Sequence, residues 1–204
     1  VKRIIYTSIA GEPSGTWFDR IIESNRQTEQ DLVDSGLQWV VGRNGLYIEP
    51  DVEALDEYVH LGRIENCADS GKCPYTTRYE LAEAYTRLAI NPTLHSRVYT
   101  LAGEPVTQKQ LTEALNHVFQ LKLHYRETGV EEFRDNRMQV LGEYMGTLVA
   151  GIYEGIRNGS FEISADYSQV TGRDHKNLIG MIREVQKEEG PWNVKGRING
   201  EDLR

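Results

Sequence analysis

Short apolar runs alternate along the chain with longer segments in which apolar residues recur every three or four positions. Runs rich in β-branched and aromatic residues predict β-strands, and the longer segments predict helices with one buried face. The predicted strands are an opening run that ends at Ile9, 37–43, 97–101 and 121–126. The predicted helices are 18–35, a segment from Pro50, 79–90, a segment capped by Thr107, 130–158 and 175–188. Strands that alternate with helices indicate an α/β fold with a parallel sheet.

Glycine, proline and polar residues mark the connecting segments. Residues 10–17 form a predicted loop, and Asn44-Gly45 is a typical turn dipeptide. Residues 62–77 are predicted to be short and irregular, and the polar tail from Gly190 to be loose.

The opening strand is almost continuously apolar, which is typical of a strand buried on both faces of a parallel sheet. It starts at Val1 with no initiator methionine. A buried strand needs a neighbour on each side, so we expect this chain to be the later part of a longer fold.

The helix predicted over 18–35 breaks its own pattern. Stepping along its inward face from Ile21 leads through Asn25 and Glu29 to Leu32, so the middle of the buried stripe is polar. Polar groups that face inward need partners or face a ligand. One interpretation is a partly solvated helix, or a buried Glu29 paired with a cation such as Arg43. The other is that Asn25 lines a site and Glu29 supports it.

Polar residues also end the first two predicted strands, with Thr7-Ser8 on one and Asn44-Gly45 on the next. Ligands of open parallel sheets bind outside the carboxyl ends of the strands. If the two strands are parallel neighbours, both pairs converge with Asn25 on one site. Taken alone, Thr7-Ser8 is an ordinary strand end and Asn44-Gly45 an ordinary turn.

Composition narrows the function classes. The net charge of −8 argues against a nucleic-acid partner. The sequence contains no run of 18 apolar residues, so no membrane-spanning segment and no membrane partner are predicted. Two cysteines, Cys67 and Cys73, are too few for a disulfide scaffold, so we expect a reduced, cytoplasmic setting. The five histidines show no metal-ligand spacing, and no metal site is predicted.

Several segments carry a family resemblance. They are RIIYTSI, TEQDLVDSGLQWVVGRNGLY, YTTRYELAEAYTRLA, RVYTLAGEPVTQKQL and FEISADYSQVTGRDHKNL. In this order and spacing they resemble the NmrA-like branch of the atypical short-chain dehydrogenase/reductases, nearest to the bacterial NAD(P)H:quinone oxidoreductases and triphenylmethane reductases. The resemblance covers residues 1–187.

The resemblance implies the C-terminal part of a Rossmann-type parallel sheet with a small α/β substrate-side domain. Residues 1–50 and 76–101 would supply the Rossmann strands and helices. Residues 51–75 and 102–189 would form the small domain, and 190–204 the loose tail. Family members begin with a strand, a Gly-rich turn and a helix that bind the dinucleotide phosphates. Here Val1 matches the fifth strand of that sheet, so we expect the phosphate-binding half upstream.

The wider superfamily uses a Tyr-x-x-x-Lys dyad. Its positions fall on Ile21 and Asn25, so neither residue type is retained and no catalytic residue is assigned. The cofactor implied by the resemblance is NADP or NAD, with implied contacts from Thr7, Ser8, Asn25, Asn44 and Gly45. Tyr47 and Trp17 are assigned to the substrate side. Arg43 is expected to pair with Glu29 rather than to touch substrate.

The resemblance implies an NAD(P)H-dependent reductase of quinone-like or dye-like acceptors, to which the nicotinamide supplies a hydride. One alternative is a non-catalytic NmrA-type regulator that senses dinucleotide. A nucleotide-sugar epimerase relative is less favoured, because that chemistry needs the missing dyad. The expected partners are a small-molecule acceptor and, through an exposed sheet edge, a second copy of this chain.

Overall fold

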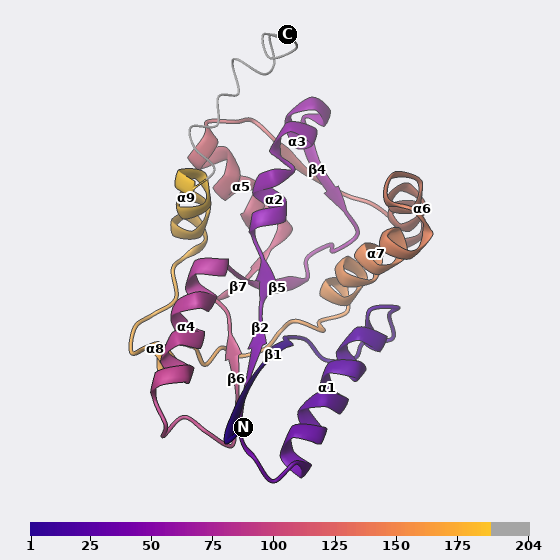
Figure 1. The fold of residues 1–204 in the computed structure, drawn as a ribbon. Helices are drawn as coiled ribbons and strands as arrows, with labels where there is room; N and C mark the ends of the chain where they lie inside the picture. The colour runs from indigo at the N-terminus through magenta and orange to yellow at the C-terminus, as the bar shows by residue number, and fades with distance from the viewer. Residues whose placement is uncertain (189–204) are drawn as a thin grey trace, which may run out of the picture.

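The computed structural model describes residues 1–188, and a three-stranded parallel sheet lies at its centre (Figure 1). The strands are β1 (Arg3–Ile9), β2 (Gln38–Asn44) and β6 (Arg97–Leu101), in the order β1-β2-β6. All neighbours run parallel. The predicted parallel α/β sheet is therefore confirmed, and so are the two strands expected to lie side by side.

One helix covers each face of this sheet (Figure 1). Helix α1 (Asp19–Asp34) lies on one face, and α4 (Arg78–Ile90) lies on the other. The α4 face is apolar: Leu81, Ala84 and Leu88 of the helix pack with Val40 and Leu101 of the sheet. The α1 face carries Asn25 and Glu29, the two polar residues in the inward stripe of the predicted helix 18–35.

The rest of the chain builds a second layer of structure beyond the carboxyl ends of the central strands (Figure 1). Its strands are β3 (Leu46–Tyr47), β4 (Arg63–Asn66), β5 (Lys72–Thr76), β7 (Pro105–Thr107) and β8 (His124–Glu127). Its helices are α2 (Glu49–Glu53), α3 (Leu55–Leu61), α5 (Gln108–Phe119), α6 (Val130–Leu141), α7 (Glu143–Arg157) and α9 (Leu178–Glu188). The short helix α8 (Tyr167–Thr171) packs instead beside α4 and β6 of the central sheet. Strand β5 pairs parallel with β3 and antiparallel with β7, while β4 pairs parallel with β8.

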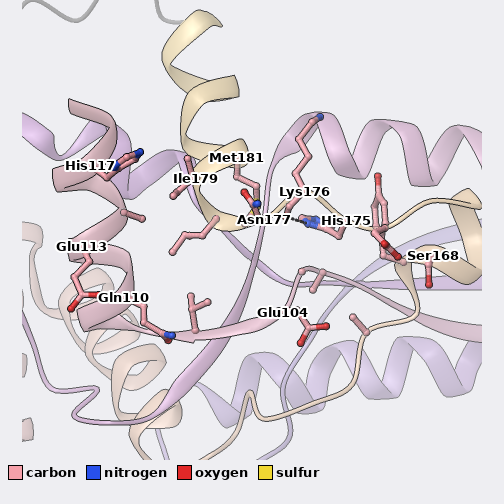
Figure 2. A pocket seen from close by; sticks show the side chains of 18 residues that line it. Glu104, Gln110, Glu113, His117, Ser168, His175, Lys176, Asn177, Ile179 and Met181 are labelled. Atoms are coloured by element: carbon pink, nitrogen blue, oxygen red, sulfur yellow. Dashed lines mark hydrogen bonds between the residues drawn. The ribbon is translucent and has the colours of Figure 1, made fainter. Parts of the chain in front are cut away.

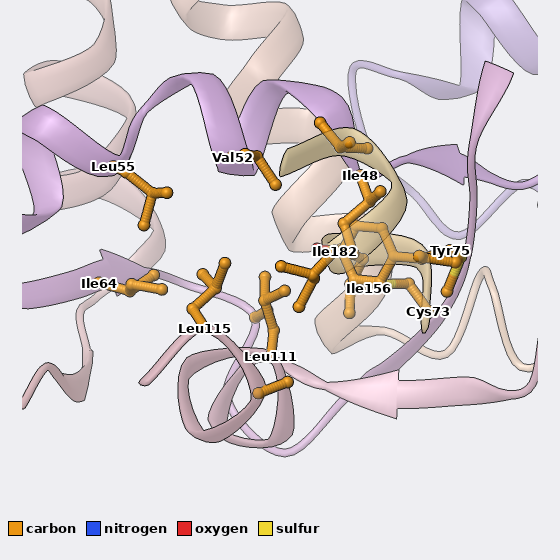
Figure 3. Close-up of a cluster of buried hydrophobic side chains, with 14 of the residues drawn as sticks. Ile48, Val52, Leu55, Ile64, Cys73, Tyr75, Leu111, Leu115, Ile156 and Ile182 are labelled. Atoms are coloured by element: carbon orange, nitrogen blue, oxygen red, sulfur yellow. The ribbon is translucent and has the colours of Figure 1, made fainter. Parts of the chain in front are cut away.

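Aliphatic side chains from these elements form the largest core (Figure 3). Ile48, Leu55, Leu111, Leu115 and Ile182 are completely buried in it. Full burial of such a side chain stabilises the fold by about 1.5–3 kcal/mol before entropy is counted. The strands of this layer are short, so its stability depends mainly on the apolar side chains that α5 and α9 contribute to this core.

Residues 62–77 were predicted to be irregular, and this prediction was wrong, because they form β4 and β5. In β4 the buried Ile64 and Asn66 alternate with half-buried positions, whereas β5 is buried continuously from Cys73 to Thr76. Buried polar residues such as Asn66 hid this alternation from a pattern based on apolar residues.

The single helix predicted over 130–158 was also wrong. The chain turns at Gly142, whose φ is +82°, and α6 and α7 fold back against each other. A Cβ on Gly146 would collide with the backbone of Met138, so the close approach of the two helices requires glycine. The helical pattern continues across the break because both helices bury apolar faces.

Smaller differences concern element ends. The helix predicted from Pro50 is two helices, α2 and α3, that meet at Ala54. The fourth strand lies at His124–Glu127 rather than 121–126, and the last helix begins at Leu178 rather than at residue 175. The division into a Rossmann part and a substrate-side part stays a prediction, and the predicted tail 190–204 lies outside the described residues. Within residues 1–188, no helix combines the length and the apolar character needed to cross a membrane.

Candidate functional site

A buried carboxylate lies at the carboxyl end of β1. Glu29 of α1 is 6% exposed and accepts hydrogen bonds from Ser8 Oγ (2.6 Å) and Arg43 Nη2 (2.6 Å). Arg26 Nη1 donates to the same carboxylate at 2.8 Å. Burial acts to raise the pKa of Glu29, but the bonds from Arg43 and Ser8 and the charge of Arg26 lower it overall. The predicted pairing of Glu29 with Arg43 is confirmed.

This group of four residues, Ser8, Arg26, Glu29 and Arg43, is called the Glu29 cluster below. It also fixes the loop that follows β1. Arg26 donates to the carbonyl oxygens of Ile9 (3.1 Å) and Gly11 (2.5 Å). The cluster therefore sets the path of the chain at the strand ends, where ligands of open sheets bind.

The other end of the same loop is fixed by Asp19 at the start of α1. Its carboxylate accepts backbone hydrogen bonds from Ser14, Gly15 and Thr16. Burial opposes ionisation, but these donors lower the pKa of Asp19 overall. Loop 10–17 is thus held by the Arg26 guanidinium near its start and by the Asp19 carboxylate near its end.

Asn25 does lie near the strand, but its amide is engaged within the fold. Its Oδ1 accepts a hydrogen bond from the Tyr6 hydroxyl at 2.9 Å, and its Nδ2 donates to the Ile21 carbonyl at 2.9 Å. Ile21 packs against the large core. Neither position carries a proton donor of the dyad type.

A second polar group lies on the α4 face of the same strand ends. The Tyr85 hydroxyl donates to Asn44 Oδ1 at 2.7 Å, and Asn44 Nδ2 donates to the Tyr47 hydroxyl at 3.0 Å. Burial raises the pKa of Tyr85 to about 12, and the hydrogen bonds that its hydroxyl shares with Thr7 and Asn44 oppose this rise. Asn44 is buried, whereas Tyr47 is 41% exposed and Thr7 is exposed.

Gly45 follows Asn44 at a point where three segments meet. A Cβ at this position would lie 2.7 Å from the Ala102 Cβ and 2.5 Å from the Pro74 carbonyl oxygen. Only glycine lets β5 and the turn after β6 approach β2 so closely. Trp17 contacts a different region: its ring packs edge-on against Tyr144 at 5.5 Å, and the Arg20 guanidinium lies over it.

The structure therefore brings the predicted residues to neighbouring strand ends but divides them between two faces. Ser8 and Asn25 lie on the α1 face, and Asn44 and Tyr47 lie on the α4 side with Tyr85. Arg26 and Tyr85 were not predicted. Arg26 had a sequence signal, since it stands one helical turn before Glu29. Tyr85 had none, because it aligns with Leu81 and Leu88 on one face of the predicted helix 79–90.

A second buried carboxylate, Glu80 of α4, binds the segment that precedes α9. It is fully buried and accepts hydrogen bonds from Arg173 Nη2 and Lys176 Nζ, each at 2.8 Å. Burial opposes ionisation, but these two bonds lower the pKa of Glu80 to about 2. Arg173 and Lys176, which lie in the last of the segments that carry the family resemblance, thus bind the segment before α9 to α4.

An open cavity of about 920 Å³ lies between α5, α9 and the segment 165–177 (Figure 2). Ala102, Gly103 and Glu104, directly after β6, form part of its wall. Ala102 of this wall packs against Gly45, the residue after Asn44. The cavity therefore adjoins the hydrogen-bonded residues Asn44, Tyr47 and Tyr85. Among residues 1–188, no cluster of three or more histidine, cysteine or carboxylate side chains is arranged to hold a metal ion.

No protein-family model matches the chain. Among curated proteins, it is 28% identical over 203 residues to an NmrA-like family domain-containing oxidoreductase of Aspergillus flavus. It is 27% identical over 188 residues to quinone oxidoreductase 2 of Escherichia coli. These alignments cover 95% and 89% of this chain but only 66% and 64% of the relatives.

Solved structures show the same fold. The NADPH complex of the Escherichia coli NADPH-dependent quinone oxidoreductase matches 93% of this chain and 66% of its own, with a TM-score of 0.81 and 24% identity. The NADP(H) complex of Citrobacter sp. triphenylmethane reductase matches 91% and 65%, with a TM-score of 0.79 and 23% identity. A nucleoside-diphosphate-sugar epimerase of Staphylococcus aureus matches 90% and 65%, with a TM-score of 0.82 and 20% identity. The fold is Rossmann-like, and the matches support the NmrA-like resemblance.

Proposed function

We propose that this NmrA-like chain is the C-terminal part of an NAD(P)H-dependent reductase of quinone-like or dye-like acceptors. The observation that carries the proposal is the Glu29 cluster, which fixes the strand ends and the loop after β1 in a fold shared with NADPH-bound reductases. The chain spans about two thirds of these proteins, so the remainder of the enzyme would supply the phosphate-binding half.

The residues at the strand ends suit the nicotinamide end of such a cofactor. Thr7 is exposed at the carboxyl end of β1. Gly45 would contact the cofactor only through its backbone, because Pro74 and Ala102 fill the space where a side chain would stand. Ser8 is 1% exposed and bonded to Glu29, so its role in this proposal is to hold the strand end in place. Asn25 would present an amide already oriented by Tyr6.

The cofactor supplies the hydride, and the chain supplies binding and orientation. The Glu29 cluster holds loop 10–17 against the strand ends through bonds to Ile9 and Gly11. The Asn44 amide orients the exposed Tyr47 hydroxyl on the proposed acceptor side. Whether the enzyme prefers NADPH or NADH would be set by residues outside this chain.

A regulator that binds dinucleotide without turning it over is the second candidate. It is favoured by the positions of the dyad, where Ile21 is apolar and the Asn25 amide is already bonded to Tyr6 and Ile21. The same observation weighs against an epimerase, despite the fold match to one.

The test is to mix the full-length protein with NADPH or NADH and a small quinone and to follow the nicotinamide absorbance. The reductase proposal expects acceptor-dependent oxidation, and it expects Glu29→Gln to reduce kcat/KM at least tenfold. Gln27→Ala is the matched control on the same helix, because Gln27 is exposed and its side chain bonds only to Asp31 within residues 1–188. Cofactor binding without oxidation would establish the regulator instead.

We also propose a cytoplasmic location, which is consistent with two free, buried cysteines in the described part of the chain. The proposed partners are the small-molecule acceptor and a second copy of the chain.

A further inference from the structure

The cavity between α5 and α9 has no role in the proposed function. Its lining includes apolar side chains, called the floor below, and three carboxylates, called the rim; Figure 2 labels Ile179 and Met181 of the first set and Glu104 and Glu113 of the second. The floor comes from three elements. Val106 lies on β7, Ala114 on α5, and Leu178, Ile179 and Met181 on α9. Met181 and Ala102 are almost completely buried at its base. An apolar surface of this kind binds hydrocarbon or aromatic groups.

The rim carries three carboxylates, from Glu104, Glu113 and Asp174. All three residues are exposed, and within residues 1–188 none of the three carboxylates has a hydrogen bond or an ion pair to another side chain. They come from three separate segments, the turn after β6, α5 and the segment before α9. The negative charges of these three carboxylates are therefore not neutralised by an ion pair within the described residues.

Three basic side chains also line the cavity: His117 of α5 is exposed, whereas Lys176 and His175 are bound within the fold. The Lys176 ammonium is bound to Glu80 at 2.8 Å and to Glu184 at 2.7 Å. The ring nitrogens of His175 bond to Thr76 Oγ1 at 3.0 Å and to the Lys176 carbonyl at 2.8 Å. Burial also lowers the pKa of His175, which disfavours a positive charge on this imidazole.

We propose that this cavity binds a hydrophobic organic cation, with its apolar body on the α5–α9 floor and its charge at the Glu104, Glu113 and Asp174 rim. Charge complementarity selects the cation, because an anion of the same shape would meet three carboxylates. A bare metal ion does not suit a site whose floor is apolar. This inference is independent of the proposed reductase activity.

Tetraphenylphosphonium and tetraphenylborate provide a matched pair of probes, because they share one shape and carry opposite charges. Titration calorimetry of the full chain is expected to show saturable binding of the cation and at least tenfold weaker binding of the borate. Equal or tighter binding of the borate would overturn the proposal, and so would the absence of cation binding.

The location is tested by NMR of ¹³C-methyl methionine, since the chain has three methionines and only Met181 lies in the cavity. The cation is expected to shift the Met181 methyl resonance while leaving Met138 and Met145 unchanged. A shift at Met145, which is exposed on α7, would place the ligand elsewhere and overturn the proposal.

The role of the rim is tested with E104Q/E113Q/D174N. This triple variant is expected to weaken cation binding at least tenfold and to remove the preference over the borate. The control is E23Q/E131Q/E143Q, which makes the same charge change at exposed positions away from the cavity. Circular dichroism of both variants verifies the fold, and equal binding by the two would contradict the proposed rim.

Discussion

At the scale of single residues, two buried carboxylates in different surroundings have opposite energetics. Glu29 is ionised because three donors surround it. Asp51 of α2 is buried with hydrogen bonds only from the tyrosines Tyr58 and Tyr75, and desolvation raises its pKa to about 6. Glu29 therefore favours the folded state when charged, whereas the charge on Asp51 opposes folding.

Charge reversal tests the Glu29–Arg43 pair. Glu29→Arg or Arg43→Glu alone leaves a buried charge without its partner, and each is expected to lower the free energy of unfolding by about 3–5 kcal/mol. The double reversal is expected to recover at least half of the summed loss, as measured by urea denaturation. Strictly additive losses would show that the two side chains do not interact.

For Asp51 we predict that Asp51→Asn stabilises the protein at pH 7. Because the pKa of Asp51 is higher in the folded state, the unfolded chain loses this proton at a lower pH than the folded protein does. The contribution of Asp51 to stability is thus fully present below its ordinary pKa of 3.8 and is lost as the pH rises through about 6. A shift of this size corresponds to about 3 kcal/mol.

The measurement is the difference in unfolding free energy between the variant and the wild type as a function of pH. It is expected to grow from pH 4 to pH 7, because other carboxylates titrate in both proteins and cancel. A difference that stays constant over this range would contradict the assigned pKa.

At the scale of elements, the fold depends on contacts that glycine and buried ion pairs permit between segments. The hairpin of α6 and α7 requires Gly142 to turn and Gly146 to allow close packing. The segment between α8 and α9 is bound to α4 through Glu80. The sequence of each element predicts only that it is a helix or a loop, so neither contact between elements could be predicted from it.

Gly146→Ala is expected to lower the free energy of unfolding by about 1–3 kcal/mol, because the new methyl group collides with the Met138 backbone. Gly129→Ala serves as the control. Gly129 has an extended backbone with φ of −67°, and a Cβ there meets open space. Equal effects of the two substitutions in thermal unfolding would argue against the tight hairpin.

Glu80→Gln is expected to cost about 3–5 kcal/mol, because Arg173 and Lys176 lose the carboxylate that compensates their charge. The contribution of Glu80 is present above its ordinary pKa of 4.5 and is lost as the pH falls through about 2. Glu83→Gln, which removes a more exposed partner of Arg173, is expected to cost less than about 1 kcal/mol. Chemical denaturation at pH 7 and pH 3 distinguishes the two variants, and losses of the same size would refute the special role of Glu80.

At the scale of the whole molecule, the central sheet has β1 as an outer strand, with β2 on its only paired side among the described residues. Outer strands present unpaired backbone groups that join other chains. We therefore predict that this 204-residue polypeptide self-associates when it is produced alone.

Sedimentation over a range of concentrations measures this association. Thr7→Lys, which places a charge at an exposed position on β1, is expected to shift the protein toward monomer. Gln30→Lys, at an exposed position of α1, is the control. A wild-type chain that stays monomeric at high concentration would contradict the prediction.

The alternation of apolar strands with amphipathic helices was sufficient to predict the α/β class and the parallel central sheet. A polar residue in the buried stripe of one helix also suggested the Glu29–Arg43 pair, as one of two interpretations. These features depend on local periodicity, or on a polar residue placed in an otherwise apolar stripe, and both are visible in the sequence. The polar strand ends were also visible, although their role in cofactor binding stays a prediction.

Other features were decided only by contacts between distant segments. Strand β4 forms by pairing with β8, and β5 forms by pairing with β3 and β7. Asn66 can be buried because its side-chain amide donates a hydrogen bond to Gln108, which is 42 residues away. The division of Ser8 and Asn44 between two faces follows from strand pleating once the sheet is assembled. Burial and hydrogen bonding across such separations depend on the positions of all elements together, which no local pattern encodes.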